Sequence, residues 1–479
     1  MPPVLLIALD AQILSHFVDS FPNLRKIKEK SHEISMSSIF PPKAPSAWAS
    51  IYTGLNPAQH GIVYFVDPLE KLSAYADEDE DNKIIRGKTF WDIAGRHGKR
   101  VCVMFPFLGY PIWPVNGIMV GRSTKLYNNI YPVQAYPRSI ENQYDLMKLS
   151  PIKSVPQKKL YSKYIESYHN LVSSEAEFSL KLLKQEQWDL FFIYSSALDW
   201  VGHNLWSYFD ENDPAYPGGN PFQEVMFQFY QQYDEIIGKL IDGAGPDTAV
   251  IIFSDHGQMR RPSRLVNINW ILSDEGLLMP RIKRHNITDP IYMLESVKKG
   301  LTKIVNRYGA GRLTMKVIHR APNIRKMFTR PLSIDWDKTI ACVSDLSGIK
   351  AYSYGGIIIA RDRLGGRNYE ELRDFIIQKL QNIRVPGEQR RVIKWVRRRE
   401  ELYSGAYLLK YPDVVFQMED DFGVGWAVNE PLITPCETHN IQPGSHKEET
   451  AVLLVYHPKG IELNKRQLTL TDIAPIVLI

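Results

Sequence analysis

The chain has 479 residues, 44% of them hydrophobic and 23% charged, so it is long enough and apolar enough to bury a large core. No window approaches the roughly eighteen uncharged apolar residues of a membrane span, and a net charge of +5 is too mild to indicate nucleic-acid binding. Three widely spaced cysteines form neither a CxxC pair nor a disulfide framework, so we expect reduced thiols in a cytoplasmic protein.

Short apolar runs predict buried parallel strands, because each is rich in branched or aromatic residues and too short for a typical helix. The runs are Val4–Leu9, Leu190–Tyr194, Ala249–Phe253 and Ala451–Tyr456. The first has no basic segment before it and runs straight into Asp10, so we interpret it as a strand and not as a signal peptide. Helical stretches with mixed faces, such as Ser173–Gln185 and Gln223–Leu240, lie between the runs. The pattern predicts an α/β fold with a doubly wound, mostly parallel sheet.

A strongly basic segment interrupts this pattern at residues 277–333. Between Arg281 and Arg330 there are thirteen Lys or Arg residues against two acidic residues. We expect a basic helical insertion, serving as a cap, while residues 1–276 and 334–479 form the metal-binding core. An amphipathic basic helix can lie on an anionic membrane surface, although a solvated cap without a ligand is the simpler interpretation. A second basic cluster follows at Arg390–Arg399.

Acidic residues follow three of the four predicted strands. Asp10 follows the first, Asp199 comes after the second with His203 four residues later, and the Asp255–His256 pair follows the third. Because function in open α/β sheets collects beyond the carboxyl ends of the strands, these side chains are expected at one edge. His446 stands just before the fourth strand, and the sequence leaves open which edge it reaches.

These residue types are those that bind zinc or manganese. Carboxylate oxygen and imidazole nitrogen are common ligands of both ions. Three protein ligands per ion leave a position open for a phosphate oxygen, and two ions roughly 4 Å apart can clamp the attacking and leaving oxygens. Each motif alone is weak, since an isolated Asp-x-x-x-His is most often a surface helix pair. Their common placement after strands strengthens the prediction.

The motifs in their order resemble the alkaline phosphatase superfamily, in particular its type I phosphodiesterase and nucleotide pyrophosphatase branch. The resemblance is greatest to prokaryotic predicted phosphohydrolases or phosphomutases, and it covers nearly the whole chain. The sequences that carry it include LIALDA, SAWASIYTGLNPAQHGI, TFWDIAGRHGKRV, WDLFFIYSSALDWVGHNLW, SDHGQM and GSHKEE. It implies two divalent metal ions, one held by Asp199, His203 and His446 and the other by Asp10, Asp255 and His256.

The resemblance also locates the catalytic nucleophile, and there this chain departs from the family. The family's Thr or Ser lies nine residues before the threonine of the TG pair, here Thr53, which places Ala44 at that position. Alanine has no nucleophilic oxygen, so a covalent phospho-enzyme cannot form on it. The asparagine that helps the nucleotide pyrophosphatases to bind phosphate is replaced by Ala47.

Three explanations for Ala44 are open. The sequence is an inactive form, Ser46 replaces the nucleophile, or a metal-bound hydroxide attacks directly. Against the second explanation, Pro45 places Ser46 in the first turn of a helix. Lys43 is a candidate phosphate contact, although an exposed loop lysine is the simpler interpretation. His60 is interpreted as a structural histidine.

Two functions therefore remain. The first is a metal-dependent hydrolase of a phosphomonoester or phosphodiester, acting on a phosphorylated small molecule or nucleotide-like substrate. The second is a catalytically silent metal-binding protein that binds phosphorylated ligands. The intact ligand set favours the first, and Ala44 favours the second.

Overall fold

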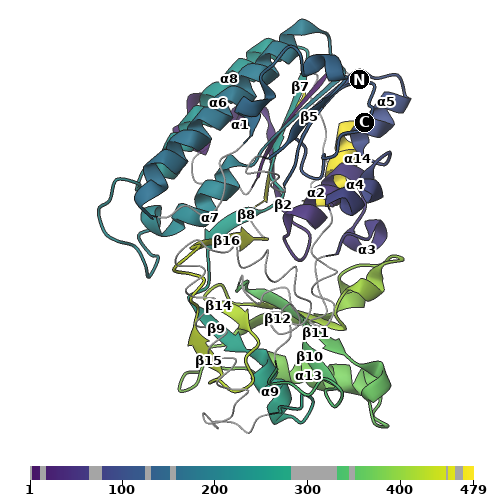
Figure 1. Ribbon diagram of the computed structural model, residues 1–479, viewed down its shortest axis with the longest axis vertical. Helices are drawn as coiled ribbons and strands as arrows, with labels where there is room; N and C mark the ends of the chain where they lie inside the picture. The colour runs from purple at the N-terminus through teal and green to yellow at the C-terminus, as the bar shows by residue number, and fades with distance from the viewer. Residues whose placement is uncertain are drawn as a thin grey trace. The chain divides into compact units, whose positions relative to one another are not determined.

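The computed structural model describes residues 3–10, 18–63, 78–124, 131–150, 158–281, 332–344, 351–448, 451–458 and 468–478. The chain divides into two compact units (Figure 1). The first contains Met1–Tyr64, Ala76–Arg260 and Gln442–Ile479, and the second is built on Arg261–Ile441. Every site residue predicted from the sequence belongs to the first unit.

A nine-stranded sheet forms the centre of the first unit, in the order β18-β2-β17-β7-β1-β6-β3-β4-β5. Most neighbours are parallel, and β1, β6 and β7 are buried along their whole length, as strands covered on both faces must be. The predicted mostly parallel α/β sheet is confirmed. The strands are β1 (Val4–Leu9), β2 (His32–Ser37), β3 (Val101–Met104), β4 (Gly117–Arg122), β5 (Val133–Tyr136), β6 (Leu190–Ser195), β7 (Ala249–Phe253), β17 (Ala451–Tyr456) and β18 (Leu468–Thr469).

One predicted strand runs the other way. Strand β17 pairs antiparallel with both β7 and β2, so the expectation that it is parallel was wrong. An apolar run buried on both faces carries no information about direction, which is set by its connections. Because β17 is antiparallel, its first residue lies at the edge where β1, β6 and β7 end.

Helices cover both faces of this sheet (Figure 1). On one side lie α1 (Pro22–Lys30), α6 (Tyr161–Gln185) and α8 (Val225–Ala244); on the other lie α2 (Ala44–Thr53), α4 (Glu78–Ile85), α5 (Phe90–Arg96) and α14 (Ile473–Leu478). Helix α2 ends at Gly54, whose positive φ of 70° suits glycine. Helices α3 (Pro57–His60) and α7 (Ala197–Phe209), and the strand pair β8 (Gly257–Arg260) and β16 (Gly444–Lys447), also belong to the first unit.

The second unit has its own sheets and its own core. Strands β10 (Ala341–Val343), β11 (Tyr354–Ile359), β13 (Val414–Met418) and β12 (Ile393–Arg398) form an antiparallel sheet in that order. A smaller sheet joins β14 (Phe422–Gly425), β9 (Arg264–Asn267) and β15 (Ile433–Pro435). Helices α9 (Ile268–Asp274) and α13 (Tyr369–Gln381) pack with them around a hydrophobic cluster that includes Val266, Ile357, Ile376 and Phe416.

This division differs from the boundaries expected from the sequence. Residues 334–441, which we assigned to the metal-binding core, belong to the second unit because their strands pair with one another and close a separate core. Most of the predicted basic insertion, residues 282–331, lies outside the described residues. Its helical character and its role as a cap therefore stay predictions.

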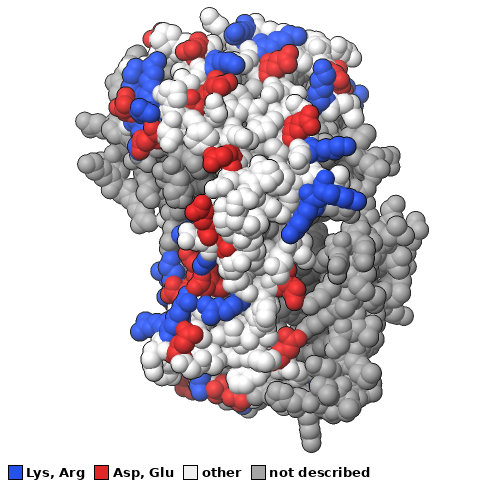
Figure 2. Space-filling model, turned by 90° about the vertical axis from the view of Figure 1, so that its left-hand side faces the viewer, with Lys and Arg blue, Asp and Glu red and all other residues white. Residues whose placement is uncertain are grey.

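Three members of the second basic cluster, Arg390, Arg398 and Arg399, form ion pairs within the second unit. Arg398 contacts Asp374 at 2.5 Å and Glu370 at 2.9 Å, and the buried Arg399 contacts Asp413 at 3.2 Å. Figure 2 likewise shows basic and acidic side chains interspersed on the face that it presents. Among the described helices, none is long and apolar enough to cross a membrane.

Candidate metal centre

Asp10 and Asp255 reach the same point because β1 and β7 are in parallel register. Ala8 pairs with Phe253, so each aspartate stands two residues beyond a paired position. Both side chains are buried. One oxygen from each lies within 4.8 Å of the other and of a ring nitrogen of His256, the residue after Asp255.

Asp199 and His203 come from one face of helix α7. They are four residues apart, about one helical turn, and Asp199 Oδ1 lies 3.1 Å from His203 Nε2. Helix α7 begins shortly after β6 ends at Ser195, and Asp199 lies in its first turn. The helix thus starts at the carboxyl edge of the sheet, where Asp10 and Asp255 also lie.

His446 is brought to this edge by the pairing of β16 with β8. Strand β8 begins directly after His256, and in the antiparallel register His446 pairs with Gln258. The rings of His256 and His446 stack with their centroids 3.9 Å apart. Strand β17 follows β16 and is antiparallel to β7, so His446 lies at the edge where β1, β6 and β7 end. The sequence alone left this position open.

Two glycines permit the close approach of α7 to this strand pair. A Cβ on Gly202 would lie 1.9 Å from Gln258 Oε1, and a Cβ on Gly444 would lie 2.3 Å from the Gly202 carbonyl oxygen. Contacts below about 3 Å are not tolerated by real Cβ atoms. A side chain at Gly444 would meet the α7 backbone, and one at Gly202 would displace the Gln258 amide, so both glycines support the approach of His203 and His446.

The six side chains form two adjoining groups. In one, His203 Nε2 lies 2.9 Å from His446 Nε2, and Asp199 Oδ1 lies 3.7 Å from the same His446 atom. In the other, His256 Nε2 lies 3.2 Å from Asp255 Oδ2 and 3.7 Å from Asp10 Oδ1. His256 is also within 4.8 Å of Asp199 and His446, so the groups touch.

All three histidines direct Nε2 into the centre. Nδ1 of His203 is 2.8 Å from the Gly444 carbonyl, that of His446 is 2.7 Å from the Pro42 carbonyl, and that of His256 is 3.1 Å from the Gly257 carbonyl. A carbonyl oxygen only accepts, so each Nδ1 carries the hydrogen and donates it. In the neutral ring Nε2 then keeps its lone pair, which is the tautomer of a metal ligand.

Electrostatics at the centre favour a bound cation. Burial, and then the negative charges of Asp255 and Asp199, hold the pKa of Asp10 well above its usual value. Burial, and then the charges of His256 and Lys43, hold the pKa of His446 well below its usual value, so its ring is neutral. Burial acts to raise the pKa of Asp199, but its contacts with His203, His256 and Gln258 together outweigh burial and lower it.

The donor set fits divalent ions. Asp10 Oδ1 and His256 Nε2 are buried and make no hydrogen bond to any described residue. Carboxylate oxygens and imidazole nitrogens in groups of three suit zinc or manganese. The Asp and His groups can therefore hold divalent ions, while the identity of the ions stays a prediction.

Ala44 is the first residue of α2, and it is half-buried. Ser46, two residues later in the same helix, is fully buried, and its Oγ donates a hydrogen bond of 2.8 Å to the Ile62 carbonyl. That hydroxyl holds the following loop in place. His60 holds the loop as well, since its Nδ1 accepts the Ile62 amide hydrogen at 3.1 Å and its Nε2 lies 3.0 Å from Ser50 Oγ.

The interpretation of Lys43 as an exposed loop lysine was wrong. Its side chain is only 6% exposed, and its positive charge contributes to the lowered pKa of His446. The neighbouring Pro42 carbonyl accepts the His446 hydrogen bond, which ties the start of α2 to the centre. Lys43 lies in extended backbone just before a helix that has proline in its first turn. Nothing in that local pattern predicts that its side chain is buried.

Sequence reasoning missed a supporting set around the ligands. Tyr194 donates a hydrogen bond of 2.5 Å to Asp10 Oδ2, which leaves Oδ1 turned toward His256. The Gln258 amide donates to the Asp199 carbonyl at 3.1 Å. Tyr194 sits in an apolar run and so was interpreted only as core, whereas Gly202 and Gln258 lie within the very motifs that carry Asp199 and His256.

Residues 4–331 match the family model described as type I phosphodiesterase / nucleotide pyrophosphatase. The chain belongs to this family. Members of the type I phosphodiesterase family include phosphodiesterases and nucleotide pyrophosphatases, so the chain is of the phosphohydrolase type, within the alkaline phosphatase superfamily. No curated protein sequence matches the chain.

Solved structures show the same fold at low identity. Phosphonoacetate hydrolase from Sinorhizobium meliloti 1021, in complex with phosphonoformate, is 16% identical with a TM-score of 0.54, and the match covers 100% of this chain and 95% of that one. Human ectonucleotide pyrophosphatase / phosphodiesterase 5 is 12% identical with a TM-score of 0.50, covering 99% and 93%. These likenesses confirm the alkaline-phosphatase-like fold.

Proposed function

We propose that this chain contains a two-metal site of the phosphohydrolase type. The site binds phosphomonoesters or phosphodiesters and lacks the covalent nucleophile of its family. Asp199, His203 and His446 hold one divalent ion, zinc or manganese. Asp10, Asp255 and His256 hold the other. The substrate class is a phosphorylated small molecule or a nucleotide-like ester.

One observation carries this proposal. The Nε2 atoms of His203 and His446 face each other at 2.9 Å beside the Asp199 carboxylate, while the Nδ1 atom of each ring donates to a backbone carbonyl. Ligands placed about 2.0–2.2 Å from a common ion are separated by roughly 3–3.5 Å, which is close to the spacing here. When both rings are neutral, neither Nε2 carries a hydrogen, because each Nδ1 is already the donor to a carbonyl. The two lone pairs then converge on one point, as the ligands of a metal ion do.

Divalent ions in this centre would supply the positive charge that polarises a phosphoryl group and stabilises the oxygens of an in-line displacement. The chain's own residues do the rest. Tyr194 fixes the orientation of Asp10, and the Gly444 carbonyl fixes that of His203. Lys43, buried at the start of α2, supplies a further cation for a phosphate oxygen.

The nucleophile position decides between turnover and silent binding. Ala44 offers no oxygen, and the Ser46 hydroxyl is buried and bonded to the Ile62 carbonyl. Among the described residues at the start of α2, none therefore offers an accessible hydroxyl. This favours, as the second candidate, a protein that holds metals and phosphorylated ligands without turning them over.

Restoring the oxygen tests the proposal. Ala44→Thr is compared with Ala44→Val, which has the same shape without the hydroxyl, using p-nitrophenyl phosphate and bis-p-nitrophenyl phosphate with saturating zinc or manganese. The turnover rate of Ala44→Thr should exceed that of the unchanged chain by several orders of magnitude, which is the loss seen when other enzymes lose their nucleophile. Ala44→Val should show no turnover. Equal turnover of the two variants contradicts the lost-nucleophile account. If the unchanged chain is active and Ser46→Ala abolishes that activity, Ser46 is the nucleophile.

The membrane role of the basic segment needs a separate test. Its proposed attraction to anionic lipid predicts co-sedimentation with anionic vesicles and none with neutral ones. Equal binding to both kinds of vesicle would remove the electrostatic explanation.

A further inference from the structure

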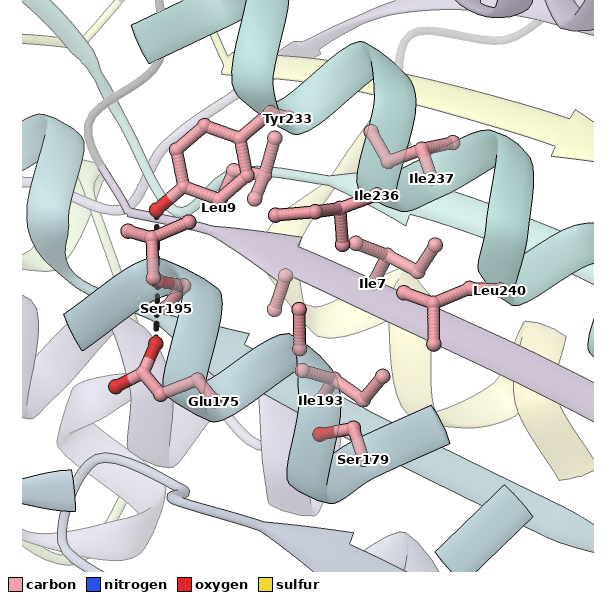
Figure 3. A pocket seen from close by; sticks show the side chains of 13 residues that line it. Ile7, Leu9, Glu175, Ser179, Ile193, Ser195, Tyr233, Ile236, Ile237 and Leu240 are labelled. Carbon is pink, nitrogen blue, oxygen red and sulfur yellow. Dashed lines mark hydrogen bonds between the residues drawn. The ribbon is translucent and has the colours of Figure 1, made fainter. Parts of the chain in front are cut away.

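A buried polar chain lies behind the carboxyl end of β6. Arg122 at the end of β4 donates from Nη1 to Glu175 Oε1 at 2.6 Å, and both side chains are almost fully buried. The Ser195 hydroxyl lies 2.9 Å from Glu175 Oε2 and 2.7 Å from the hydroxyl of Tyr233 (Figure 3). Four elements, β4, α6, β6 and α8, thus meet in one network.

The hydrogen-bond directions in this network are fixed. The Ser195 hydroxyl donates its single hydrogen to Glu175 Oε2. The Ser195 oxygen then accepts from Tyr233, which is the donor at the end of the chain. Burial, and then the charge of Glu175, raises the pKa of Tyr233, which keeps its hydrogen in place.

The surroundings of this network are mainly apolar. Glu175, Ser195 and Tyr233 line a cavity of about 20 Å³ whose other walls are mainly aliphatic, among them Ile7, Ile193 and Ile237 (Figure 3). That volume is enough for about one water molecule. Besides that space, the remaining polar group in the lining is the Ser179 hydroxyl, so each member of the network depends mainly on the partners that it already has.

Ser195 connects this network to both halves of the metal centre. Its carbonyl accepts the amide hydrogen of Asp10 at 3.0 Å. It is also the last residue of β6, four residues before Asp199 in the first turn of α7. Fixing Ser195 therefore fixes the backbone that presents one ligand of each group.

We propose that Arg122, Glu175, Ser195 and Tyr233 form a positioning device for the two-metal centre. The inference rests on the proposed function, since it concerns the ions held there. None of the four contacts a ligand atom directly, so they are positioning residues that act through the backbone of Asp10 and Asp199.

The test compares Ser195→Ala with Ser179→Ala. Ser179 is fully buried on α6, lines the same cavity, and its hydroxyl makes no hydrogen bond to a described residue, so it is a matched control. The measurement is the affinity of the metal-free full chain for Zn²⁺ by competition with a chromogenic chelator, alongside urea unfolding. Ser195→Ala should weaken Zn²⁺ binding about 10- to 100-fold, as losses of supporting hydrogen bonds do at other metal sites, and Ser179→Ala should leave it unchanged.

The outcomes separate the two proposals. A purely structural role would shift the urea midpoint of Ser195→Ala but leave its Zn²⁺ affinity equal to that of Ser179→Ala, and this result overturns the positioning role alone. If Ser195→Ala fails to fold, Tyr233→Phe takes its place in the same comparison with Ser179→Ala. This substitution removes only the hydroxyl that donates to Ser195. Absence of Zn²⁺ binding by the unchanged chain overturns both this inference and the proposed function.

Discussion

His203 and His446 approach each other through their Nε2 atoms, 2.9 Å apart, while each donates its Nδ1 hydrogen to a backbone carbonyl. When both rings are neutral, these two atoms direct lone pairs at the same point. The Asp199 carboxylate, 3.1 Å from His203, adds negative charge there. A divalent ion at this point would be bound by the two imidazoles and the carboxylate together.

Metal binding should therefore stabilise the fold. With Zn²⁺ or Mn²⁺ at about one hundred times the dissociation constant, the free energy of unfolding should rise by about 2.7 kcal/mol for each independent site. Thermal or urea unfolding of the metal-free chain, titrated with each ion, measures this. In His203→Ala, the metal-induced increase in the free energy of unfolding should be smaller by roughly the contribution of one site. A free energy of unfolding that does not change with either ion would contradict the proposed metal centre.

Tyr194→Phe should weaken metal binding without disturbing the sheet. The substitution removes the 2.5 Å hydrogen bond that holds Asp10 Oδ2, so the carboxylate can rotate away from its ligand geometry. We expect a loss in metal affinity of about tenfold or more. Tyr369→Phe is the control, because it removes a tyrosine–aspartate hydrogen bond of the same length, to Asp413, within the second unit, which contains no predicted ligand. Equal affinities for the two variants would refute the role given to Tyr194.

Gly202→Ala should separate α7 from β8. Its Cβ would lie 1.9 Å from Gln258 Oε1, and moving that amide breaks its bond to the Asp199 carbonyl. We expect a loss of about 1–3 kcal/mol in the free energy of unfolding, with weaker metal binding.

Two further variants make the Gly202 result specific. Gly243→Ala in α8 meets no atom closer than 3.3 Å and should be neutral or slightly stabilising. Combining Gly202→Ala with Gln258→Ala should recover part of the loss, because the clashing atoms are gone. No recovery in the double variant would show that the clash is not the cause.

The strands and the order of the ligands could be predicted because burial on both faces leaves a plain apolar signature. Runs such as Leu190–Tyr194 therefore located β6, and Asp10 and Asp255 followed from strand ends. Strand direction has no such signature, so the antiparallel β17 and with it the position of His446 were beyond the sequence. The same holds for Lys43 and Tyr194, whose roles depend on tertiary contacts and not on local pattern.

The second unit was hidden for a related reason. Strand β12 buries Ile393 and Val396, which are three residues apart because a bulge interrupts its pairing between Ile393 and Trp395. Within a cluster dominated by Arg and Lys, this irregular spacing hides the strand, and the segment was interpreted as charge alone. Its arginines instead pair with acids from distant positions, such as Asp374 and Asp413, which no local pattern reveals.

The most direct test of the metal centre is an anomalous diffraction measurement on crystals of the unchanged chain grown with Zn²⁺ or Mn²⁺. The account predicts two peaks roughly 4 Å apart, one bounded by Asp199, His203 and His446 and the other by Asp10, Asp255 and His256. Crystals that contain the metal but show no peak between these six side chains would contradict it.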